Sequence, residues 1–101
     1  MRAMLAAFGT CIFLISSAGS AAIDCSRPRS NVDKLVCSSS DLTVAQEQMA
    51  YSFRMAMRRG VDLNELRRTQ QEWYENVRNA CNDIPCLRKA FDERGAELDN
   101  Y

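Results

Sequence analysis

Cysteine is the residue type in this sequence with the clearest chemistry. Beyond the first 22 residues the chain has Cys25, Cys37, Cys81 and Cys86. Four thiols form two disulfides in an oxidising compartment, and a zinc site is the alternative. Zinc is disfavoured because the chain has no histidine and because the first two cysteines have a C-x11-C spacing. Of the three possible disulfide pairings, the two local loops, Cys25 with Cys37 and Cys81 with Cys86, are favoured.

The sequence is poor in residues for catalysis. Without histidine, Ser-His and Cys-His nucleophile pairs are excluded. Glu72 with Glu75, or Asp92 with Glu93, would be candidate carboxylate pairs for glycoside hydrolysis, which needs two carboxyls facing each other across a cleft. Glu72 and Glu75 are three residues apart on one expected helix and are expected to face water. We therefore predict a protein that is not an enzyme and that has no catalytic residues, no metal and no cofactor.

Residues 1–22 have the pattern of an export signal. Arg2 is followed by an apolar stretch from Met4 to Ile15 and by a run of small residues that ends at Ala22. A membrane anchor is the alternative, but the strongly apolar part covers only about a dozen residues, whereas a span needs roughly 20. We expect a signal peptide at 1–22, one domain at 23–101, a periplasmic or secreted location, and no stable membrane insertion after cleavage.

The charges are balanced in number but sorted along the chain. Without Arg2 the sequence has 12 basic and 13 acidic side chains, so the charge gives no reason to expect nucleic acid as a partner. Basic residues bracket one expected bend: Arg54, Arg58, Arg59, Arg67 and Arg68. Acidic residues gather near the C-terminus: Asp92, Glu93, Glu97 and Asp99. Solvated helix faces are the more common explanation, and a polarised surface for a protein partner is the alternative.

Apolar residues recur at helical spacing from about residue 31 onward. Asn31 is predicted to cap a short turn that ends at Cys37, and Ser40 to cap a helix over 41–59 that Gly60 ends. The stripe expected to be buried on this second helix is Leu42, Ala45, Met49, Phe53 and Ala56 or Met57.

Two further helices are predicted. Asp62 and Glu65 have the spacing of a capping box, which opens a third helix toward Ala80. After a turn at 82–85, a fourth helix covers 86–99. The expected buried stripes are Leu63, Leu66, Gln70, Trp73, Val77 and Ala80 on the third helix, and Leu87, Ala90, Phe91, Arg94 and Leu98 on the fourth. The predicted fold is all-α, a small bundle of three to four helices with two local disulfides.

These motifs, taken in order, resemble a known family, the exported proteins similar to the N-terminal domain of the lysozyme inhibitor LprI. The resemblance begins with Asp24-Cys25 and with the segment from Val32 to Cys37, which is similar to the family's V-E-x-x-I-C. It continues with Gln70-x-x-Trp73, similar to Q-x-x-W, and with the segment Arg78-Asn79-Ala80-Cys81, similar to R-N-x-C. Cys86-Leu87 and Phe91-x-x-Arg94 complete it, with Leu42, Met49 and Leu98 at the family's apolar positions.

The resemblance implies an all-helical, two-disulfide exported domain, some of whose relatives inhibit lysozyme. Gln46 stands where the family usually has an aspartate, and Phe53 and Phe91 replace tyrosines. Any partner contact made through those polar groups is therefore in question.

Two classes of function remain. In the first, the protein binds a lysozyme-type hydrolase and covers its cleft, with Asp92, Glu93, Glu97 and Asp99 steering a basic partner. In the second, it is a structural or accessory envelope protein with another protein partner. The motif residues Gln70, Trp73, Arg78, Phe91 and Arg94 are expected to support the fold. An exposed Met55 with Tyr51 or Tyr74 would suit an adaptable contact patch.

Overall fold

The computed structural model describes residues 23–101, and the predicted signal peptide, residues 1–22, lies outside the described residues. The elements are α1 (Asn31–Cys37), α2 (Ser40–Arg58), α3 (Leu63–Asn76), the 3-10 turn η1 (Arg78–Ala80) and α4 (Ile84–Asp99). No strand occurs in this part of the chain. The predicted small all-α bundle is confirmed.

Serine side chains begin the first two helices, each one residue earlier than predicted. The hydroxyl of Ser30 accepts a hydrogen bond from the amide of Asp33 at 3.1 Å, and that of Ser39 accepts one from Leu42 at 3.2 Å. Asn31 and Ser40 are instead the first helical residues. A capping side chain must belong to the extended residue before the helix, and Ser30 and Ser39 have that backbone conformation.

Glycine ends α2 as predicted, and an aspartate begins α3. Gly60 has a φ of 82°, which is unfavourable for a residue with a Cβ atom. Asp62 Oδ1 accepts from the amides of Asn64 at 2.9 Å and Glu65 at 3.2 Å. Asp62 thus makes its half of the predicted capping box. The carboxylate of Glu65 bonds to the guanidinium of Arg68 instead of the Asp62 amide.

The predicted boundaries between α3 and α4 were wrong. α3 ends at Asn76 and not at Ala80, because the φ of Val77, −116°, is far from the usual α-helical value of about −63° and a separate 3-10 turn follows. α4 begins at Ile84, two residues before the predicted start, and Asp83 caps it by accepting from the Cys86 amide at 2.9 Å. Pro85 lies in the first turn of α4, where its missing N–H needs no partner.

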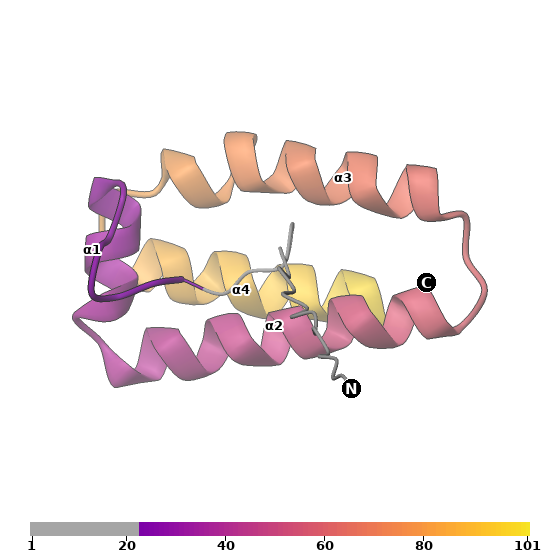
Figure 1. Cartoon of the computed structure of the whole chain (residues 1–101), viewed down its shortest axis with the longest axis horizontal. Coiled ribbons are helices and arrows are strands. Elements are labelled where there is room, and N and C mark those ends of the chain that lie inside the picture. Colours follow the sequence, from indigo (N-terminus) through magenta and orange to yellow (C-terminus); the bar gives the residue numbers. More distant parts are fainter. Residues whose placement is uncertain (1–22) are drawn as a thin grey trace, which may run out of the picture.

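α2 and α4 run in the same direction, and α3 returns antiparallel to both (Figure 1). Near the starts of α2 and α4, Arg88 Nη1 lies 3.2 Å from Asp41 Oδ2. Near their ends, Arg59 Nη2 donates to the backbone oxygen of Leu98 at 2.7 Å. The bend between α2 and α3 therefore lies at the same end of the bundle as the last turn of α4.

The core lies between α2, α3 and α4, and Val32 and Val36 of α1 contribute to it. On α2 and α4 every predicted core position is buried, with Ala56 rather than the half-buried Met57 facing inward. On α3 the buried residues are Leu66, Gln70 and Trp73. The prediction was wrong for Leu63 and Val77, which are 40% and 42% exposed, and for the exposed Ala80. Leu63 is in the exposed first turn of α3, and Val77 and Ala80 follow its last helical residue, so all three lie at or beyond the ends of the buried stripe.

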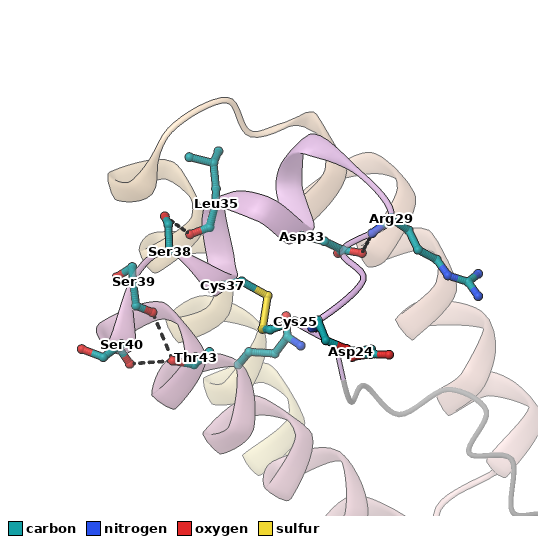
Figure 2. Close-up of a disulfide and its surroundings, with 12 residues drawn as sticks. Asp24, Cys25, Arg29, Asp33, Leu35, Cys37, Ser38, Ser39, Ser40 and Thr43 are labelled. Carbon is teal, nitrogen blue, oxygen red and sulfur yellow. Dashed lines mark hydrogen bonds between the residues drawn. A yellow bond between two sulfur atoms is a disulfide. The ribbon is translucent and has the colours of Figure 1, made fainter.

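Both predicted disulfides are present, and the zinc alternative is wrong. Cys25–Cys37 ties the N-terminal arm to the end of α1, with Cα atoms 5.6 Å apart (Figure 2). Cys81–Cys86 ties the residue after η1 to the first turn of α4, with Cα atoms 5.5 Å apart. Disulfides of this kind are typical of proteins in oxidising, non-cytoplasmic compartments.

Candidate functional site

Arg94 joins α4 to α3 through the interior of the bundle. Its side chain is almost fully buried, and its Nε donates to Gln70 Oε1 at 2.8 Å. Its Nη2 donates to Thr69 Oγ1 at 3.1 Å, and its Nη1 donates to Glu97 Oε1 at the same distance. The Gln70 amide in turn donates to the sulfur of Met49 on α2. Gln70 and Arg94, two residues of the family motif, are therefore placed in the core.

Tyr101 extends this network at the end of the bundle. Its hydroxyl is 2.8 Å from Thr69 Oγ1, and its ring lies 5.9 Å from the Arg94 guanidinium. Arg59 Nε donates to the backbone oxygen of Tyr101 at 3.3 Å, in addition to its bond to Leu98. These contacts hold the last turn of α4 against α3 and the end of α2 without a covalent crosslink.

Arg78 forms a second buried cluster at the opposite end. Its side chain is 1% exposed, and its Nη2 donates to Asp33 Oδ1 at 2.9 Å and to Gln46 Oε1 at 3.2 Å. Its Nη1 donates to Asn79 Oδ1, and its guanidinium lies 4.7 Å from the centre of the Tyr74 ring. The cluster joins η1 to α1, α2 and α3, with Arg78 paired to the Asp33 carboxylate inside it.

The three departures from the family pattern lie in the interior. Gln46 is 4% exposed and supplies an oxygen to Arg78, as an aspartate at that position would. Phe53 is 9% exposed and Phe91 is 1% exposed. All three side chains are buried, so these differences from the resembled pattern bear on packing.

Trp73 is a core residue. It is 7% exposed, and its ring lies 5.8 Å from that of Phe91 and 5.6 Å from that of Tyr74, the latter in an edge-to-face arrangement. Burial raises the pKa of the Tyr74 hydroxyl above its ordinary value, while the nearby positive charge of Arg78 acts in the opposite direction. The aromatic cluster adds to the apolar area between α3 and α4.

The acidic residues predicted to contact a partner are all exposed on the second half of α4. Helical spacing divides them into two rows. Asp92 and Asp99 are seven residues apart on the side of Arg88, which reaches Asp41 of α2. Glu93 and Glu97 are four residues apart on the side of α3, and Glu97 bonds to Arg94. The spacing that separates the two rows can be read from the sequence, but the helix that each row faces cannot.

Three of the four carboxylates pair with bases on their own helix. Arg88 Nε lies 3.1 Å from Asp92 Oδ2, and Lys89 Nζ lies 3.9 Å from Glu93 Oε2. Glu97 is the third, through Arg94. At the bend, Arg68 likewise pairs with residues of its own helix, since its guanidinium lies 2.8 Å from both Glu65 and Glu72. The basic and acidic segments, far apart in the sequence, meet at the same end of the bundle.

A row of exposed side chains also follows the outer side of α2. Val44 is 55% exposed and Tyr51 is 56% exposed, and Met55 is half-buried beside them. Tyr51 and Met55, four residues apart, share this face, although the predicted contact patch assumed an exposed Met55. Tyr74 is on α3 and is partly buried against Trp73, so it does not belong to the patch. Val44 was missed because an isolated exposed valine has no distinctive signal in a sequence.

Neither a metal site nor a membrane span is found in the described residues. No group of three or more histidine, cysteine or acidic side chains in residues 23–101 is arranged to hold a metal ion, and no helix there is long and apolar enough to cross a membrane. Glu72 and Glu75 are exposed, and each bonds to a neighbour on α3, Arg68 and Gln71 respectively.

No protein-family model, curated protein or solved structure matches this chain.

Proposed function

We propose that the chain is an exported binding protein that inhibits a lysozyme-type cell-wall hydrolase by covering its active-site cleft. The resemblance of the ordered motifs to the LprI-like family supplies the type of partner. The observation that carries the proposal is the exposed carboxylate surface on the second half of α4, because it is the surface suited to a strongly basic enzyme.

The ion pairs within α4 leave its carboxylates available to a partner. The side chains of Asp92, Glu93 and Glu97 are 56%, 62% and 62% exposed. The pairs of Asp92 and Glu93 join exposed side chains, and such pairs stabilise a helix by only about 0.3 to 0.5 kcal/mol, whereas Glu97 pairs with the buried Arg94. A lysine or arginine of a partner that approaches in a drier interface is therefore able to replace the intrahelical base of Asp92 or Glu93 at small cost.

The rigidity of the scaffold also favours tight binding. The buried Arg94 and Arg78 clusters fix both ends of the bundle, and the two disulfides lie at the end where α2 and α4 begin. A surface that is already ordered before binding loses less conformational entropy when the complex forms. Inhibition by occlusion needs this property more than it needs a reactive group.

The test is a cell-wall lysis assay with the purified, oxidised mature protein. Lysozymes of the c, g and i types are each titrated with increasing molar ratios of the protein. We expect at least one enzyme to be inhibited stoichiometrically, with no turnover of the inhibitor. A heat-denatured, reduced sample serves as the control. Full activity of all three enzymes at a large molar excess of folded protein would refute the lysozyme proposal.

One observation favours the second candidate, an accessory envelope protein with a different partner. The outer face of α2 combines Val44, Tyr51 and Met55 with the exposed Arg54 and Arg58. A basic hydrolase would be repelled by those arginines, so this face suits another occupant. Loss of an envelope phenotype in a Tyr51 variant that still inhibits lysozyme would support this candidate.

A further inference from the structure

The outer face of α2 has the spacing of a helix-pairing seam. Val44, Gln48, Tyr51 and Met55 follow one another at intervals of four, three and four residues. This spacing is that of the a and d positions of a heptad, with Gln48 and Met55 at one position and Val44 and Tyr51 at the other. The residues of α2 that face the core are a different set, which includes Leu42, Met49 and Phe53. α2 therefore has one apolar face in the core and a second, partly apolar face on the outside.

Two opposite charges flank this outer row on the same side. Glu47 and Arg54 are both exposed and are seven residues apart, so they occupy equivalent positions along α2. Within residues 23–101 neither forms an ion pair with another residue, although the Arg54 guanidinium lies 5.9 Å from the Tyr51 ring. Tyr51 lies close to the midpoint between them.

We propose that two copies of this chain associate through this face of α2, with the two helices antiparallel. In a two-fold antiparallel pair, flanking positions on the same side of the seam face each other. Glu47 of one copy then meets Arg54 of the second copy, and the symmetry repeats the pair. The Tyr51 side chains lie near the axis. A parallel pair sets equal residues at equal height and brings neither charge to its complement.

The size of the surface determines the strength of this association. Figure 1 shows α2 at an edge of the bundle with α4 on its other side, so a second copy reaches α2 alone. One helix face buries less than the roughly 1,200 Å² at the lower limit for stable complexes. The dimer is therefore weak and forms at high local concentration, such as that of an abundant protein in a narrow compartment.

The experiment is sedimentation velocity of the oxidised mature protein over a wide concentration range. We expect the wild type to change from monomer to dimer as the concentration rises. Glu47→Arg and Arg54→Glu each replace two attractive contacts with two repulsive ones, and we expect each to raise the dissociation constant about tenfold. An equimolar mixture of the two single variants restores both pairs, so it should dimerise at least as well as the wild type. The double variant should recover as well.

Glu75→Arg on α3 is the matched control, because it makes the same charge change on an exposed residue away from the seam. It should dimerise as the wild type does, and circular dichroism should show that all variants are folded. A wild type that stays monomeric throughout overturns the proposal, even if it captures another protein. Single variants that dimerise normally, or a mixture that fails to recover, also overturn it, because the interface then lies elsewhere or has another orientation.

Discussion

Arg94 on α4 donates a hydrogen bond from its Nε to Oε1 of Gln70 on α3, across 2.8 Å in the interior of the bundle. The same guanidinium also serves Thr69 and Glu97, so one side chain satisfies acceptors on both helices. Because buried polar groups are costly when they lose their partners, this relationship makes Arg94 a residue on which folding depends.

We expect Arg94→Met to lower the free energy of unfolding by about 2 to 4 kcal/mol, because it keeps the apolar stem but leaves the buried Gln70 oxygen and the Thr69 hydroxyl with fewer partners. Urea denaturation measures the change. Arg67→Met, an exposed arginine on α3, is the matched control and should change stability little. In the double variant with Gln70→Leu, the two losses should be less than additive, and strict additivity would contradict the proposed network.

Trp73→Ala is expected to cost about 3 to 5 kcal/mol, since it removes a large buried ring and leaves a cavity beside Phe91. Thermal and urea unfolding both report the loss. Trp73→Phe keeps part of the ring volume and should cost less. An alanine variant with an unchanged melting temperature but weaker binding to a lysozyme would instead make Trp73 a contact residue.

The raised pKa of Tyr74 leads us to expect a loss of stability in alkaline solution. Its pKa is raised in the folded state by burial, so folding favours the protonated hydroxyl. This contribution is complete below the unfolded pKa, near 10, and is lost as the pH rises through the folded pKa. Stability should therefore fall above about pH 10. Denaturation midpoints measured across that range should fall less steeply for Tyr74→Phe, and identical slopes would show that another group causes the loss.

The exposed acidic row of Asp92 and Asp99 is expected to control the association rate with a basic hydrolase. Reversal of both charges to lysine should lower the association rate more than it raises the dissociation rate, because exposed charges act mainly during the encounter. Added salt should reduce the difference, since screening acts within about 8 Å at physiological ionic strength. Stopped-flow or surface plasmon resonance measures both rates. Reversal of both Glu72 and Glu75 on α3 to lysine makes the same net charge change and is the control, and an equal effect there would mean that only the net charge matters.

Much of the core was predictable because it depends on local periodicity. The stripes of α2 and α4 repeat every three or four residues, so each predicted core position on those helices is buried. The third stripe was predicted too long, because nothing in the residues from Val77 to Ala80 marks the change from an α-helix to a 3-10 turn. Helix starts were displaced by one or two residues where several capping residues adjoin, as at Ser39 and Ser40.

The polar clusters depend on the tertiary arrangement, which the sequence does not specify locally. Arg78 meets Asp33 from 45 positions earlier, and Arg94 meets Gln70 from 24 positions earlier. The direction of α4 relative to α2 also follows from how α3 packs, and no local pattern reports it. For the same reason the helices that the two rows of carboxylates on α4 face, and the exposure of the outer face of α2, became visible only when the buried faces were known.

The parallel course of α2 and α4 has an electrostatic consequence. Each helix has a macrodipole that places roughly half a negative charge at its C-terminal end, and parallel helices set these two partial charges side by side. Arg58 lies in the last turn of α2, and Arg59 donates to the carbonyls of Leu98, in the last turn of α4, and of Tyr101, two residues beyond its end. The arginines at the bend thus offset two aligned macrodipoles, to whose negative ends Glu97 and Asp99 in the last turn of α4 add their own charge.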